Sequence, residues 1–308
     1  MEFPYNIART VSTTQNAIIT ENGVFHTFNS LNDLSNKAWL KFQKSWFVLN
    51  PKPRGKDVLL HPAKFPEELV ESFVTFFTKR GQTVLDPMAG TGSALIASLQ
   101  SGRNAVGIEL LGKYFNTTKE RLIKTKGEVE SQEGKHSLKV SARLINGDAR
   151  EIKKMEIGLV DYCITSPPYW DMLRMRGFET QKERKEKGLD VNYSEDPKDV
   201  GNISDYEEFL DTLAEIYAKV HDVLKPGGYL TVVVKNVKKG GRIYPLAWDL
   251  ARRLGNFFVL KDERIWCQDN VKLAPYGYGR SWVSNTVHHY CLNFRKDIGR
   301  TRIPPRRL

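Results

Sequence analysis

The sequence predicts an α/β protein built on a doubly wound, mostly parallel sheet with an antiparallel strand at one edge. Between residues 81 and 235, short runs of β-branched residues alternate with segments of helical periodicity, which is typical of βαβ units. Two more β-rich runs follow late in the chain, as expected for strands added at a sheet edge. At 308 residues, the chain is long enough for one large domain with a buried core and a modest extension.

The predicted elements follow one another in a regular order. Strands are expected over residues 83–85, 105–108, 142–145, 159–164 and 229–234. Helices are expected over 93–101, 113–126 and 205–224, with one more after Pro245. The late runs 257–267 and 286–294 are expected to pair antiparallel at the edge of the sheet.

The residues before position 56 do not follow this alternation of strands and helices. Trp39, Trp46 and Phe47 lie there among lysines and polar residues. Buried aromatic residues mostly serve packing, so an N-terminal cap on the core is favoured over a nucleic-acid surface. We therefore divide the chain into an N-terminal extension, 1–55, and a main domain, 56–308.

The charge balance points to a polyanionic partner. Lysine and arginine number 47 against 36 aspartate and glutamate residues, a net charge of +11. Such an excess favours binding to nucleic acid, although a generally basic surface is the simpler alternative. Cys163, Cys267 and Cys291 lack metal-ligand spacing and are interpreted as reduced core residues, so no metal is expected. Because no signal peptide or long apolar stretch occurs, we expect a cytoplasmic protein that does not enter a membrane.

A glycine-containing turn and three acidic residues indicate a ligand site. The sequence Asp86-Pro-Met-Ala-Gly90-Thr-Gly92 follows a predicted strand and opens a helix, where backbone can approach a ligand closely. Glu109 ends the next strand and can accept both hydroxyls of a ribose. Asp148 ends the third strand and can accept from an adenine amino group. A glycine turn without a ligand is one alternative; a nicotinamide site is another, but its G-x-G-x-x-G pattern is missing.

A second motif lies where the fourth strand ends. Ser166-Pro167-Pro168-Tyr169 combines a hydroxyl, two prolines that leave carbonyls free to accept, and an aromatic face. An exocyclic amino group becomes nucleophilic only when acceptors hold its hydrogens, and an unstacked base can lie on an aromatic ring. A proline turn that merely ends the strand would explain the prolines but not the residues beside them.

With these motifs the chain resembles the amino-methyltransferases of DNA, whose signature is [DNS]-P-P-[YFW]. Residues 61–66 and 84–87 also resemble that family's approach to its cofactor loop, and the likeness covers about 57–253. It implies a Rossmann-like methyltransferase fold and S-adenosylmethionine as cofactor. The implied catalytic residues are Ser166, Pro167, Pro168 and Tyr169. The implied cofactor-binding residues are Phe65, Asp86, Met88, Gly90, Gly92, Glu109, Asp148 and Thr165, with Met88 standing where the family commonly has Phe.

The serine form of the motif resembles enzymes that make N4-methylcytosine, whereas Asp or Asn is usual for N6-methyladenine. The resemblance implies a flipped base in DNA and in-line methyl transfer, with no metal and no covalent enzyme intermediate. Three alternatives stay open. They are an N6-adenine DNA methyltransferase, an RNA methyltransferase acting on an exocyclic amine, and a catalytically idle relative that binds nucleic acid.

Two segments are predicted to contact DNA. The stretch 171–202 follows the catalytic motif and carries several basic residues, although a solvated loop would also be basic. Around residue 280, aromatic residues, glycines and an arginine suit contact with a base or phosphate. The predicted DNA contacts are Arg174, Arg176, Lys182, Arg184, Tyr276, Arg280 and Trp282. We expect a site-specific enzyme, monomeric or homodimeric, with a cognate restriction endonuclease as candidate partner.

Overall fold

The computed structural model describes residues 17–20, 23–26, 29–51, 65–132, 139–170, 194 and 196–298, and for 17–20, 23–26 and 130–132 it describes the backbone only. Eight strands of this described part form one sheet, in the order β3-β11-β12-β8-β7-β4-β5-β6. All neighbouring strands are parallel except at β12, which runs antiparallel to β8 and β11. The predicted α/β fold with a mostly parallel sheet is confirmed.

The parallel half of the sheet contains the five strands that the sequence predicts. β4 and β5 bury every residue after their first, because helices cover both faces of the sheet. The five strands of this half are β4 (Thr83–Asp86), β5 (Asn104–Glu109), β6 (Ala142–Asn146), β7 (Val160–Thr165) and β8 (Leu224–Val234). Residues 225–228 form an irregularity in β8, between its pairs at Leu224 and Tyr229.

The other half contains the predicted antiparallel pair and one strand that was not predicted. β11 (Val259–Cys267) pairs antiparallel with β12 (His288–Arg295), as expected. β12, however, lies inside the sheet between β11 and β8. The edge beyond β11 is occupied by β3 (Trp46–Val48), which pairs parallel with it and comes from the N-terminal extension. A three-residue strand leaves too short a pattern to be recognised from sequence.

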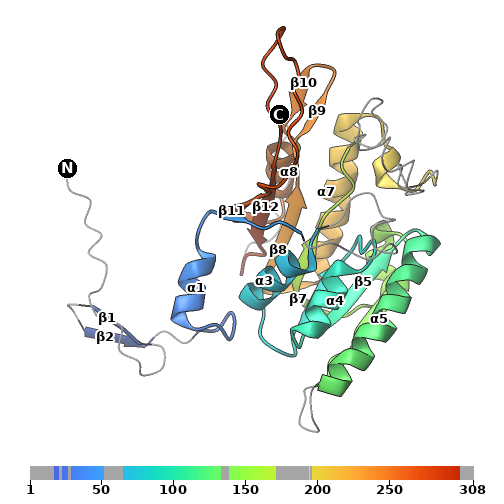
Figure 1. The fold of residues 1–308 in the computed structure, drawn as a ribbon. Helices are drawn as coiled ribbons and strands as arrows, with labels where there is room; N and C mark the ends of the chain where they lie inside the picture. The colour runs from blue at the N-terminus through green and yellow to red at the C-terminus, as the bar shows by residue number, and fades with distance from the viewer. Residues whose placement is uncertain are drawn as a thin grey trace.

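Helices cover both faces of the sheet, and a separate hydrophobic core lies between the sheet and the helices on each face. Leu85 packs into the core under α7 (Tyr206–Val223) and α8 (Leu246–Leu254), whereas its neighbour Val84 points to the opposite core. That second core lies under α3 (Glu67–Phe77), α4 (Ser93–Gln100) and α5 (Gly112–Gln132) (Figure 1). Consecutive strand residues alternate between the faces, so the sheet is doubly wound as predicted.

The sequence of α7 shows why this helix forms. The Asp205 carboxylate caps its first turn by accepting from the Glu208 N–H at 2.8 Å. Phe209, Leu213 and Val220 are buried at helical spacing, so one stripe of the helix faces the core. The helix ends where β8 begins.

The described part of the N-terminal extension packs on α3 and β11. In α1 (Asn36–Phe42), the Phe42 ring stacks on Phe76 with centroids 3.9 Å apart. The Arg264 guanidinium lies 3.9 Å from the Phe42 ring centroid and 4.5 Å from that of Phe47. Its Nε donates to the Lys44 carbonyl at 2.9 Å. Aromatic stacking, cation–π contacts and a backbone hydrogen bond therefore join residues 29–51 to the main domain.

The remaining described elements are short. They are β1 (Ala17–Thr20), β2 (Gly23–His26), β9 (Val237–Lys239), β10 (Arg242–Tyr244), η1 (Ala149–Met155) and η3 (Val200–Asn202). Cys163 and Cys291 are buried, Cys267 is half-buried, and all three are free thiols. Among the helices that are described, none has the length and apolar character needed to cross a bilayer.

Candidate active site

A crevice opens where β4, β5, β6 and β7 end. It encloses about 650 Å³ of empty space, part of it open to solvent. Ligands of open α/β sheets bind at this edge. Six predicted site residues line it together: Met88, Gly90, Glu109, Asp148, Ser166 and Pro168. The structure thus brings residues of both predicted motifs to one place.

The glycine loop after β4 is held tightly to β5. Gly90 N–H donates to Glu109 Oε2 at 2.8 Å, and Leu111 N–H donates to Glu109 Oε1 at 2.8 Å. Ala89 N–H donates to the Ile108 carbonyl at 2.8 Å. Glu109 therefore fixes the loop and also faces the crevice, so its carboxylate is positioned before any ligand arrives.

Gly92 has a structural reason to be glycine. Its φ is +82°, and a Cβ atom there would lie 2.6 Å from Thr118 Cγ2. Thr118 in turn donates from Oγ1 to the Gly90 carbonyl at 2.8 Å. Gly92 does not line the crevice. Close packing of α5 against the loop accounts for this residue, independently of any ligand.

Two carboxyl groups near the loop have strongly altered acidity. Burial raises the pKa of Glu109 to about 7, against the lowering effect of the Leu111 and Gly90 N–H groups, and nearby Asp86 and Asp199 raise it further. Burial also raises the pKa of Asp86 to about 7, while the Thr165 hydroxyl and the Met88 N–H oppose the rise. Desolvation outweighs the hydrogen bonds in both groups.

Asp86 and Thr165 lie beneath the crevice and do not line it. Asp86 is 1% exposed, and its Oδ1 accepts from Met88 N–H at 3.0 Å. Asp86 Oδ2 and Thr165 Oγ1 are buried and make no well-formed hydrogen bond among the described residues, although the Thr165 hydroxyl lies near enough to lower the pKa of Asp86. An unsatisfied buried oxygen is costly, which makes this pair unusual in the core.

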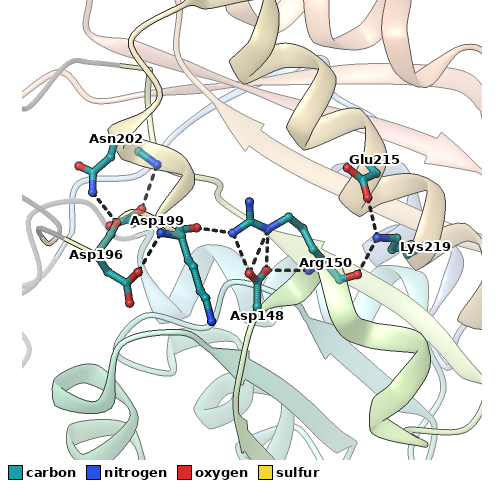
Figure 2. Close-up of polar contacts among 9 residues, drawn as sticks. Asp148, Arg150, Asp196, Asp199, Asn202, Glu215 and Lys219 are labelled. Carbon is teal, nitrogen blue, oxygen red and sulfur yellow. Dashed lines mark hydrogen bonds and ion pairs between the residues drawn. The ribbon is translucent and has the colours of Figure 1, made fainter.

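Asp148 lines the crevice, but its carboxylate is already engaged (Figure 2). Both of its oxygens accept from the Arg150 guanidinium, the shortest contact being 2.7 Å from Nη2 to Oδ2. Although partial burial raises the pKa of Asp148, the hydrogen bonds and charge of Arg150 outweigh this and lower it overall. Its predicted role as acceptor for an adenine amino group stays a prediction.

The catalytic motif divides between the crevice and the core. Ser166 and Pro168 are half-buried and line the crevice, whereas Pro167 is buried. Tyr169 is 7% exposed and packs against His289, with ring centroids 6.2 Å apart. Burial raises the pKa of Tyr169 to about 12, although the nearby Ser166 hydroxyl lowers it. The Tyr169 ring is therefore covered in this structure.

The other predicted residues lie apart from the crevice or outside the described residues. Phe65 is buried in the core under α3. Tyr276 and Trp282 are 48% and 89% exposed, and Arg280 is also exposed. Arg174, Arg176, Lys182 and Arg184 fall outside the described residues.

Several crevice residues were missed by sequence reasoning. Tyr114 comes from α5, and Lys198, Asp199 and Val200 come from the segment before α7. The acidic character of Asp199 was visible in the sequence, but nothing in the local pattern showed that it would face Glu109.

A doubly wound sheet with an acidic crevice at its carboxyl edge defines a Rossmann-like α/β protein. The family model described as DNA methylase, of the N6/N4 type, matches residues 4–120 and 160–300. The chain therefore belongs to this DNA methylase family, which confirms the resemblance found in the sequence. S-adenosylmethionine is the methyl donor of the family, as predicted.

Individual relatives match over shorter stretches. The type II methyltransferase M.BglI of Bacillus subtilis is 36% identical over 86 residues, 27% of this chain and 24% of that protein. YubD of Escherichia coli K12 is 44% identical over 62 residues, 20% of this chain and 27% of YubD. The matches thus span about a quarter of these relatives. A crystal structure of a methyltransferase from Pyrococcus furiosus is 18% identical and aligns over 77% of this chain and 87% of its own, with a TM-score of 0.43.

Proposed function

We propose that this protein transfers a methyl group from S-adenosylmethionine to the exocyclic N4 amino group of cytosine in DNA, at a specific sequence. One observation carries the proposal: Ser166 and Pro168 of the catalytic motif line the same crevice as Glu109 and Asp148. A cofactor held by the strand-end residues and an amino group held by the motif would then meet in one space. Such proximity is the main requirement of in-line transfer.

The residues of the crevice suit this cofactor. Glu109 offers a carboxylate at the end of β5, where ribose hydroxyls bind in related sheets. The Gly90 backbone lines the wall beside it, so a ligand can approach the loop closely. Acidic groups also suit a ligand that carries a sulfonium and an ammonium group. When bound, the cofactor supplies an electrophilic methyl group on sulfur.

The chain itself would activate the amino group. The Ser166 hydroxyl and the Pro167 carbonyl would accept its hydrogens and so favour the tetrahedral nitrogen that attacks the methyl carbon. As the nitrogen–carbon bond forms, the methyl–sulfur bond would break, and the nitrogen would lose one proton to solvent. Tyr169 offers a ring on which the flipped base stacks. Because the Tyr169 side chain is 7% exposed, this stacking requires the ring to be uncovered when DNA binds.

DNA would be held by basic and aromatic side chains outside the crevice. Tyr276, Arg280 and Trp282 are exposed on the stretch between β11 and β12. Arg174, Arg176, Lys182 and Arg184 are proposed to contact phosphates. If they do, replacing each should flatten the salt dependence of DNA binding by roughly one unit of slope. We propose a cytoplasmic enzyme, and the likeness to a type II methyltransferase supports a cognate endonuclease as candidate partner.

The function is tested by incubating the protein with labelled S-adenosylmethionine and plasmid DNA, followed by mass spectrometry of the nucleosides. We expect N4-methylcytosine. N6-methyladenine would overturn the cytosine assignment. If RNA offered in parallel takes up the label and DNA does not, the RNA methyltransferase alternative is favoured.

The role of the motif is tested by Ser166→Ala. The variant should lower kcat by about 10²-fold or more while changing cofactor affinity little, because the lost acceptor matters most in the transition state. Ser72→Ala, on an exposed position of α3, is the matched control and should keep full activity. A fully active Ser166→Ala protein would contradict the mechanism.

A further inference from the structure

The segment directly before α7 forms one wall of the crevice. Lys198, Asp199 and Val200 line the cavity together with Glu109 and Ser166. We call residues 196–202 the wall segment. None of its residues belongs to the glycine loop or to the catalytic motif, so its contribution to the site has to be judged from its own contacts.

Hydrogen bonds hold the wall segment in a defined turn. Asp199 Oδ1 accepts from Gly201 N–H at 2.9 Å, and Asp199 Oδ2 accepts from Ser194 Oγ at 2.8 Å. Asn202 Nδ2 donates to the Asp196 carbonyl at 2.8 Å and to the Ser194 carbonyl at 3.1 Å. Asp199 is only 6% exposed. Its carboxylate is thus fixed in position beside the cavity.

Arg150 ties this turn to the body of the protein (Figure 2). Its Nη2 donates to the Lys198 carbonyl at 2.7 Å, while the same guanidinium is held by Asp148. On the other side, Lys219 Nζ donates to the Arg150 carbonyl at 2.6 Å and to Glu215 Oε1 of α7 at 2.7 Å. Arg150 therefore sets where the wall segment lies relative to the end of β6.

The acidic groups of the crevice differ in how they are paired. Asp148 is neutralised by Arg150, but no ion pair within the described part of the chain involves Asp199 or Glu109. The negative charge of Asp199 is near enough to raise the pKa of Glu109. Lys198 also lines the cavity, but no ion pair joins it to either carboxylate among the described residues, so both can face a cationic ligand.

We propose that Asp199 is a further cofactor-binding residue, which faces the cationic methionine part of S-adenosylmethionine, and that Arg150 is the positioning residue that holds it there. This inference rests on the proposed function, because it assigns the crevice to that cofactor.

The variant Asp199→Asn tests the charge contact. Asparagine keeps an oxygen that accepts from Gly201 N–H, so the turn should persist while the charge is lost. Affinity for S-adenosylmethionine should fall on the order of tenfold, as expected for a lost charge-assisted contact. Affinity for 5′-methylthioadenosine, a neutral fragment without the methionine part, should change less than about twofold in a competition assay. An equal loss for both ligands, or no loss for either, would overturn the assignment.

Arg150→Met tests the positioning role. It should weaken S-adenosylmethionine binding in the wild-type background. Because Arg150 also holds Asp148, the loss of 5′-methylthioadenosine affinity measures that second contact. The loss beyond it should be less than about threefold in the Asp199→Asn background, since this part acts through Asp199. Arg143→Met is the matched control, because among the described residues Arg143 on β6 donates to the Met155 and Glu156 carbonyls and to no group of the crevice. Additive effects in the double variant would overturn the positioning role. If the wild-type protein does not bind S-adenosylmethionine at all, the proposed function fails; if it binds and the variants bind equally well, only this inference fails.

Discussion

Replacing Glu109 should change how stability depends on pH. Its carboxyl pKa is raised from 4.5 to about 7 in the folded protein, chiefly by burial. Between these values the folded protein keeps a proton that the unfolded chain has lost, so raising the pH from about 5 to above 7 lowers the free energy of unfolding. One pKa unit equals about 1.4 kcal/mol, so the full effect is roughly 3 kcal/mol.

The variant Glu109→Gln isolates this effect, because glutamine does not titrate. Urea unfolding at pH 5, 6, 7 and 8, without cofactor, gives the free energy of unfolding of each protein. Glutamine offers one oxygen to two N–H donors, so the variant should be less stable at pH 5 by about 1–3 kcal/mol. The difference from wild type should then shrink as the pH rises. Glu120→Gln, on an exposed position of α5, is the control and should run parallel to wild type. A constant difference for Glu109→Gln would refute the reasoning.

Two further variants probe the surroundings of the site. Burial, together with Lys235 and His288, lowers the pKa of His289 from 6.5 to about 3. The free energy of unfolding should therefore fall as the pH drops from about 6.5 towards 3. In urea unfolding, His289→Phe should show a smaller fall over this pH range than wild type. Parallel curves would contradict this expectation. Gly92→Ala should lower the free energy of unfolding by about 1–3 kcal/mol, because φ is +82° and the new Cβ meets Thr118 Cγ2. Adding Thr118→Ser, which removes that methyl group, should recover part of the loss in thermal melts; no recovery would exclude this contact as the cause.

The parallel half of the sheet was predictable because its signals are local. β4, β5 and β7 are short runs of mostly buried residues, and each ends at an acidic residue or a turn that the sequence displays directly. The same holds for Glu109, Ser166 and the loop at Gly90, which follow their strands at once and therefore meet at one edge.

The missed features depend on contacts between distant segments. β3 gains its partner only when β11 reaches the edge of the sheet, and its three residues carry no period of their own. Asp199 looks like an ordinary turn aspartate, since it caps η3. Its place beside Glu109 follows from Arg150, which holds the turn from the end of β6. Sequence periodicity describes one element at a time and carries no information on such links.

The buried carboxyl groups connect stability with binding. Asp86 and Glu109 both have a pKa near 7, because burial opposes the ionisation of their carboxyl groups. At neutral pH, keeping these two groups buried therefore costs the folded protein free energy. A core optimised for stability alone would replace them with apolar side chains or pair them with cations. The loop instead keeps Glu109 in place with two backbone N–H groups, which orient the carboxylate without neutralising it. Under the proposed function, the cationic cofactor would offset part of this cost at Glu109 when it binds.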